Sequence, residues 1–90
     1  MIYDINFTKT AKESLLKIDK SVIKRILSKI EWLGENFDFI KPLALKANLG
    51  EFYKLRVGDY RVIYTVDKRL LKITIHFVGH RREIYNIVKS

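Results

Sequence analysis

The dipeptide Gly58-Asp59 separates two segments of alternating polarity, and this pattern constrains the fold more than any other feature of the sequence. The flanking segments, Glu51–Val57 and Tyr60–Val66, are rich in Tyr, Val and Ile, which favour the pleated, half-buried surface of a sheet. A glycine-containing pair of residues between two such segments is typical of a tight hairpin turn. The sequence therefore predicts an antiparallel hairpin here.

The length of this turn decides which side chains share a face of the hairpin. A two-residue turn pairs Val57 with Tyr60 and Arg56 with Arg61, and directly opposed residues point to the same side. One face then carries three cations among apolar and hydroxyl side chains: Phe52, Lys54, Arg56, Arg61, Ile63 and Thr65. A three-residue turn that begins at Val57 would instead shift the register and send Arg61 to the other side.

The first half of the chain predicts a short strand followed by two helices. Polarity alternates over Ile2–Phe7, which indicates a strand. Either Thr8 or Thr10 is placed to begin the first helix, and Thr10-Ala-Lys-Glu13 has the spacing of a capping box.

The second helix is expected to begin at Asp19 or Ser21 and to end at Gly34. Its apolar residues recur at steps of three and four, and Trp32 is expected in the core. Two amphipathic helices joined so closely favour an antiparallel helical hairpin.

The remaining segments complete one small domain over residues 1–90. Glu35–Gly50 is interpreted as a connector, Leu70–Val78 as an apolar strand, and Glu83–Lys89 as a short terminal helix. The predicted fold class is therefore α+β. It comprises an N-terminal strand, an α-helical hairpin, a three-stranded antiparallel meander and a short C-terminal helix.

Composition limits the functions that such a chain can have. There is no cysteine, which excludes disulfides and thiolate metal sites, and with two histidines we expect neither a metal nor a cofactor. No apolar run is long enough to span a membrane, so we expect a soluble, cytoplasmic protein. The net charge of +8 predicts attraction to polyanions or to an acidic partner.

The segment that follows the last strand collects candidate site residues. Arg81 and the more distant Arg61 offer two guanidinium groups, which suit a phosphate approached from two sides. His80 is a titratable group beside these cations, while Arg82 is a further phosphate-binding candidate. The sequence contains no glycine-rich phosphate loop and no paired carboxylates at metal spacing, which argues against nucleotide hydrolysis and two-metal nuclease chemistry.

Two motifs together resemble a known family. They are Tyr53-Lys-Leu-Arg-Val-Gly-Asp-Tyr-Arg-Val-Ile-Tyr and, one strand later, Val78-Gly-His-Arg-Arg-Glu-Ile-Tyr. The chain is similar to the RelE branch of the RelE/ParE superfamily of type II toxin–antitoxin toxins, over nearly its whole length in the order of elements and most specifically in the last 40 residues.

This resemblance implies a metal-independent ribonuclease that enters the ribosomal A site and cuts messenger RNA by attack of the 2′-OH on the adjacent phosphate. It also implies a cognate antitoxin as partner, in a small complex of the two proteins. The matching positions imply a catalytic set with a neighbouring basic position, namely Lys54, Arg61, Arg81 and Tyr85, with Arg56 beside them. Phe52 stands where the best-known RelE arrangement has a lysine, and a histidine acts in other members, which makes His80 a further catalytic candidate.

Two other functions remain open at this point. A ParE-like inhibitor of DNA gyrase would use the same fold to bind a protein, and fold alone does not separate the two. A noncatalytic RNA-binding module is the other alternative. Such a sheet is expected to expose aromatic side chains, for which Phe52 is the candidate.

Overall fold

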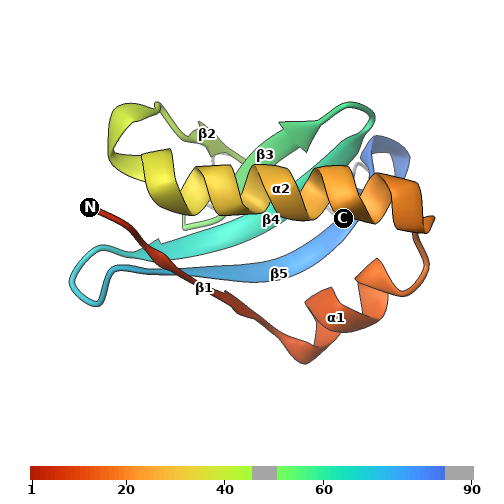
Figure 1. The fold of residues 1–90 in the computed structure, drawn as a ribbon, viewed down its shortest axis with the longest axis horizontal. Helices are drawn as coiled ribbons and strands as arrows, with labels where there is room; N and C mark the ends of the chain where they lie inside the picture. The colour runs from red at the N-terminus through yellow and green to blue at the C-terminus, as the bar shows by residue number, and fades with distance from the viewer. Residues whose placement is uncertain (46–50, 85–90) are drawn as a thin grey trace.

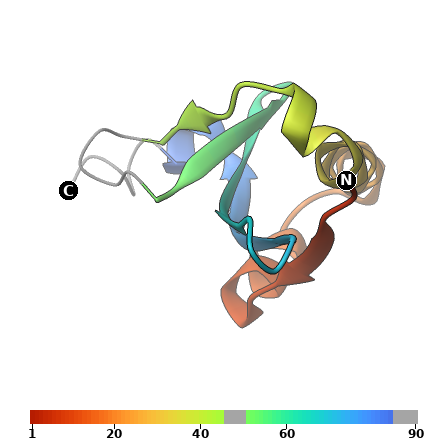
Figure 2. The ribbon, with the colours of Figure 1, turned by 90° about the vertical axis from the view of Figure 1, so that its left-hand side faces the viewer.

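The computed structural model describes residues 1–45 and 51–84, and these form one sheet covered on one face by two helices (Figures 1 and 2). The elements follow the expected order along the chain: β1 Asp4–Phe7, α1 Lys9–Leu15, α2 Lys20–Asn36, a 3-10 turn Phe37–Phe39, β2 Leu43–Ala44, β3 Tyr53–Val57, β4 Tyr60–Asp67 and β5 Lys72–His80. Residues 81–84 are helical, and the rest of the predicted terminal helix lies outside the described residues. The α+β class is confirmed.

The sheet is mixed, with strand order β1-β5-β4-β3-β2. β3, β4 and β5 form the predicted antiparallel meander, and β1 adds parallel to β5. The fifth strand was not expected. β2 lies within the segment interpreted as a connector, where Leu43 pairs with Lys54 and Ala44 with Tyr53.

The two helices begin after Thr8 and after Asp19, and only the first has a side-chain cap. Thr8 is the N-cap of α1, because its Oγ1 accepts a hydrogen bond from the Ala11 N–H at 3.1 Å. The alternative capping box at Thr10 is wrong, since Thr10 already lies in the first turn. Asp19 precedes α2 as its N-cap residue without a side-chain hydrogen bond.

The helix α2 passes through Gly34 and ends two residues later, contrary to the prediction. The glycine serves close packing: a Cβ built on it would lie 3.0 Å from the Tyr3 carbonyl oxygen and 3.1 Å from the Ile5 Cδ1. The Tyr3 N–H also donates to the Gly34 carbonyl at 2.9 Å. Gly34 thus lets β1 lie directly against α2.

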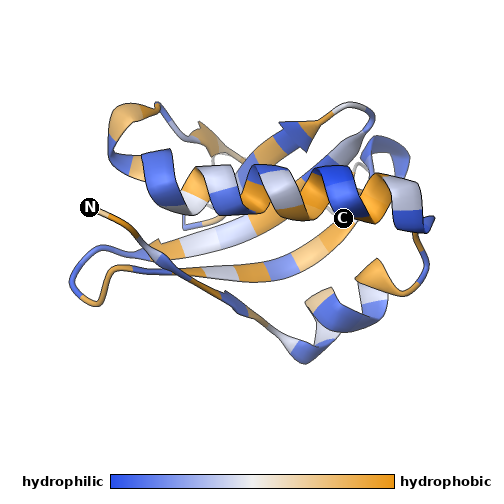
Figure 3. Ribbon diagram, viewed as in Figure 1, coloured by the Kyte–Doolittle hydropathy of each residue, from blue (hydrophilic) through white to orange (hydrophobic). Residues whose placement is uncertain are grey.

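The core lies between the helices and the sheet (Figure 3). It joins apolar residues of both layers: Ala11, Ile26, Ile30, Leu33, Leu55, Val57, Val62, Tyr64, Ile73, Ile75 and Val78. Trp32, expected in this core, is 37% exposed instead, and the Lys29 Nζ lies 3.7 Å from the centroid of its ring. Trp32 follows the buried Ile26 by six residues, which is outside the three- and four-residue steps of the buried stripe, so the Trp32 side chain points away from the sheet.

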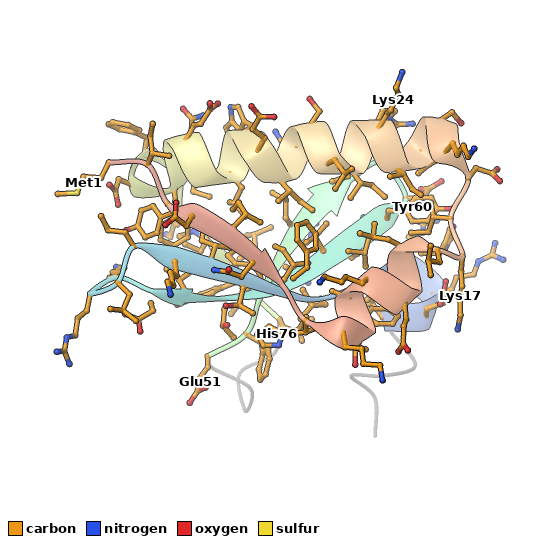
Figure 4. All side chains as sticks on the ribbon, turned by 60° about the horizontal axis from the view of Figure 1, so that its bottom comes forward. Met1, Lys17, Lys24, Glu51, Tyr60 and His76 are labelled. Atoms are coloured by element: carbon orange, nitrogen blue, oxygen red, sulfur yellow. The ribbon has the colours of Figure 1, made fainter. Side chains whose placement is uncertain are left out.

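A bulge interrupts the pairing of β4 with β5. Ile63 pairs with Phe77 while its neighbour Tyr64 pairs with Ile75, which leaves His76 as the extra residue. Beyond the bulge the alternation changes phase, so that Val78 and not Phe77 enters the core. His76 lies on the side of the sheet away from α2 (Figure 4).

Candidate active site

The hairpin β3–β4 places three cationic residues on one face. Arg56 pairs with Arg61 and Val57 with Tyr60, which confirms the two-residue turn. Gly58 has φ +59°, the conformation that a primed hairpin turn requires at this position. Because Leu55 and Val57 belong to the core, the intervening side chains point to the opposite side. We call the side of the sheet away from α2 the outer face; it carries Lys54, Arg56, Arg61 and Ile63.

Arg56 and Arg61 are directly opposed on the outer face, although like charges in such pairs destabilise a sheet. The Arg61 guanidinium turns back to the hairpin turn, where Nη1 donates to the carbonyl oxygens of Gly58 and Tyr60 at 2.9 Å each. Arg56 is exposed and Arg61 half-buried. A fold selected for stability alone has no reason to keep this pair.

A backbone hydrogen bond holds Arg81 next to the hairpin turn that precedes Arg61. Arg61 pairs with Gly79, two residues before Arg81, and the Arg81 N–H donates to the Asp59 carbonyl at 2.7 Å. The backbone of Arg81 is thus held next to the hairpin turn that Arg61 follows, and a shared phosphate site for the two residues stays a prediction.

No carboxylate neutralises these cations within the described residues 1–45 and 51–84. The single ion pair closer than 4.0 Å in that part of the chain joins the Met1 ammonium to Asp38 at 3.2 Å, at the other end of the molecule. Among the described residues, Lys54, Arg56, Arg61 and Arg81 therefore have no carboxylate partner within 4.0 Å.

His80 lies at the end of β5, with its Nδ1 accepting a hydrogen bond from the Arg82 N–H at 3.2 Å. Its ring packs edge-on to Tyr60 at a centroid distance of 5.6 Å, and its own N–H donates to the Glu83 Oε1 at 3.3 Å. Arg82 is exposed. Tyr85, the remaining candidate from the sequence, lies outside the described residues.

Phe52 lies at the far end of the outer face, in contact with the bulged His76. Their rings are 5.3 Å apart, and the His76 Nε2 lies 2.8 Å from the Thr65 Oγ1. Partial burial lowers the pKa of His76 below its ordinary value of 6.5, because burial disfavours the charged ring. The site therefore runs from an aromatic end at Phe52 to a cationic end at Arg81.

The structure also reveals basic residues that the sequence analysis missed. Lys24, Arg25 and Lys29 line an open hollow of about 510 Å³ between α2 and β3, together with Trp32. A smaller hollow of about 230 Å³ adjoins it, lined by Lys29 and Trp32 on one side and by Lys54 and Arg56 on the other. The signal was present in the sequence, because Arg25 and Lys29 lie four residues apart and so share a helix face.

Comparisons with known proteins identify a family for this chain. A family model described as the ParE toxin of the type II toxin–antitoxin system matches residues 5–85. Toxin RelG of Mycobacterium tuberculosis is 29% identical over 87 residues, which are 94% of this chain and 98% of RelG.

Solved structures show the same fold. The archaeal RelE–RelB complex of Pyrococcus horikoshii matches with a TM-score of 0.66 and 30% identity over 90% of this chain and 97% of the other. The toxin–antitoxin complex RelBE2 of Mycobacterium tuberculosis matches with a TM-score of 0.80 and 24% identity over 90% of this chain and 100% of the other.

The fold and the family match thus define a small toxin of a type II toxin–antitoxin system. Within that class, the chain belongs to the ParE toxin family of the RelE/ParE superfamily. No helix among the described residues is long and apolar enough to cross a membrane.

Proposed function

We propose that the protein is an endoribonuclease that cleaves messenger RNA in the ribosomal A site, and that a cognate antitoxin silences it. The observation that carries the proposal is the opposed pair of Arg56 and Arg61, with Arg81 fastened next to it. Uncompensated like charges on a sheet are unfavourable for folding, so their retention supports a role in binding phosphate.

The proposed reaction needs no metal, because guanidinium groups supply the positive charge. The ribose 2′-OH loses its proton and attacks the adjacent phosphorus, the bond from phosphorus to the 5′ oxygen breaks, and that oxygen takes up a proton. The products are a 2′,3′-cyclic phosphate and a 5′-OH. Negative charge grows on the nonbridging oxygens during this step, and Arg61 with Arg81 would stabilise it.

The remaining residues take supporting roles in the proposal. Lys54, which pairs with Ile63 on the outer face, would assist proton transfer. Arg56 and Arg82 hold neighbouring phosphates, and Phe52 offers a ring for a splayed base. Tyr85, by its resemblance to the matching family position, would stack on a base or orient the attacking hydroxyl.

Binding of the substrate requires Arg61 to exchange its partners. In the free protein, Arg61 donates two hydrogen bonds to the turn carbonyls. In the complex with RNA, bonds to phosphate oxygens would replace them. A phosphate carries a full negative charge that a backbone carbonyl lacks, and it can accept two parallel bonds from one guanidinium, which favours the exchange.

Complexes of related toxins support an antitoxin partner for this protein. RelE of Pyrococcus horikoshii was solved with RelB, and the RelBE2 structure is likewise a toxin–antitoxin complex. We propose that the antitoxin of this protein covers the outer face. ParE-like inhibition of DNA gyrase is the alternative, and it is favoured by the family model, whose description names ParE.

The two functions separate in one set of assays. Purified protein is incubated with messenger RNA, with and without translating ribosomes, and in parallel with gyrase and relaxed plasmid. Primer extension locates the cuts. Treatment with a 2′,3′-cyclic phosphodiesterase, which opens only a cyclic phosphate, identifies a 2′,3′-cyclic end. Ribosome-stimulated cuts at defined codon positions support the proposal. Loss of supercoiling with intact RNA would replace it by the gyrase alternative.

A further inference from the structure

The backbone that follows β5 is fastened by three hydrogen bonds around Arg81. The Arg81 N–H donates to the Asp59 carbonyl at 2.7 Å, which ties the segment to the hairpin turn. The Arg82 N–H donates to the His80 Nδ1 at 3.2 Å, and the His80 N–H donates to the Glu83 Oε1 at 3.3 Å.

The last two bonds form a reciprocal cap. The first N–H groups of a helix have no partner within the helix, and a side-chain acceptor just before it satisfies one of them. His80 does this with its ring for Arg82, while Glu83 reaches back to the N–H of His80, as the third residue of a capping box does. The carboxylate of Glu83 also lies against Gly79, 3.5 Å from the position of a built Cβ.

The reciprocal cap determines which nitrogen of the neutral His80 ring carries the proton. A nitrogen that accepts from an N–H carries no proton, so the neutral ring holds its proton on Nε2. Edge-on packing against Tyr60 at 5.6 Å restricts rotation of the ring. The lone pair of Nδ1 is thus already used by the backbone, and this nitrogen cannot take a proton from a substrate without giving up the cap.

We propose that His80 and Glu83 are positioning residues, which fix the backbone that aims Arg81 at the phosphate, and that the imidazole takes no part in proton transfer. This inference rests on the proposed ribonuclease function, because it concerns how Arg81 reaches the reacting group. A guanidinium on a long side chain needs an anchored base, since displacement by about 1 Å lowers catalysis by as much as 100-fold.

Paired substitutions separate the cap from the chemistry. His80→Ala removes the acceptor, whereas His80→Asn supplies an amide oxygen, which is among the best helix caps, and has no imidazole. Glu83→Ala and Glu83→Gln change the net charge equally, but only the glutamine keeps an acceptor. Glu13→Ala, on the exposed side of α1, controls for the loss of one negative charge.

The expected results follow from the strength of a cap. Loss of the acceptor should lower the cleavage rate between about 2-fold and about 30-fold, the equilibrium factors that correspond to known capping effects. His80→Asn and Glu83→Gln should restore most of the loss, and Glu13→Ala should match wild type. If His80→Asn is as impaired as His80→Ala, the ring has a chemical role and the inference is wrong.

A readout without RNA tests the cap by itself. Nitrogen NMR should show that the neutral imidazole carries its proton on Nε2 and none on Nδ1. Exchange of the Arg82 amide should accelerate in His80→Ala and return to the wild-type rate in His80→Asn. A proton on Nδ1 would overturn the inference even if the protein cleaves RNA. Conversely, an intact cap in a protein that cuts no RNA would refute the proposed function alone.

Discussion

Replacing Arg56 by glutamine tests directly whether the site works against the stability of the fold. Arg56 and Arg61 are opposed on the outer face, and removal of a like-charge pair relieves about 0.2 to 1 kcal/mol. Arg56→Gln keeps most of the side-chain length and leaves both hydrogen bonds of Arg61 to the turn in place. The free energy of unfolding should therefore rise by that amount.

The corresponding change is measurable by thermal denaturation. For a domain of this size, 1 kcal/mol shifts the melting temperature by about 4 to 8 °C, so Arg56→Gln should melt about 1 to 8 °C above wild type. The difference should shrink at ~1 M salt, where the screening length is about 3 Å. Cleavage of RNA should fall in the same variant, because a phosphate contact is lost.

Two controls complete the experiment. Arg69→Gln removes one positive charge from the exposed turn between β4 and β5 and should leave the melting temperature unchanged. Arg61→Ala removes the repulsion together with two hydrogen bonds, each worth about 0.5 to 1.5 kcal/mol, and should lower stability on balance. A melting temperature of Arg56→Gln at or below that of wild type, at low salt, would refute the argument from like charges.

Three further predictions concern the site, the packing and the pH dependence. Arg81→Ala should slow cleavage about 100 to 1,000-fold in a primer-extension time course, since one donor to the transition state contributes about 2.7 to 4 kcal/mol. Its circular dichroism spectrum should be unchanged. Unaltered cleavage kinetics would remove Arg81 from the mechanism. Gly34→Ala should lower the unfolding free energy in urea by up to about 2 kcal/mol, because overpacking against the Tyr3 carbonyl costs about 1 to 3 kcal/mol and the gain in helix propensity returns only about 1; a more stable variant would show that β1 shifts freely. The Tyr3 hydroxyl, and then the N-terminal ammonium, lower the pKa of Asp38 below 3.8, so Asp38 stabilises the fold above the unfolded value and loses this contribution as the pH falls through the folded one. Asp38→Asn should therefore lose less stability than wild type as the pH falls below about 5. Equal losses of melting temperature in the two proteins would contradict this.

Local patterns in the sequence were enough to predict the hairpin and its cationic face. A glycine at the turn and alternating polarity on both sides fix the pairing of Arg56 with Arg61, because the turn length sets the register and the register sets the faces. The same alternation predicts the N-terminal strand. These features depend on residues that are neighbours in the chain, and such information is present in the sequence itself.

Other features depend on which distant segments meet. The bulge at His76, which replaces Phe77 by Val78 in the core, arises from the fit of β5 to β4. Gly34 continues its helix because the backbone of Tyr3 lies against it, and a glycine in isolation predicts an end instead. Neither outcome follows from local propensity, since each is decided by partners remote in sequence.

The site shows the same division. Its cations were identified from the sequence because their positions alternate along one strand pair and follow the next. The role of His80 was not, because its ring accepts from the backbone two residues later only when Glu83 and the Asp59 carbonyl hold that backbone in a helical turn. The residue types of the candidate site can thus be identified from the sequence, whereas the hydrogen bonds that orient their side chains form only when strands distant in sequence have paired.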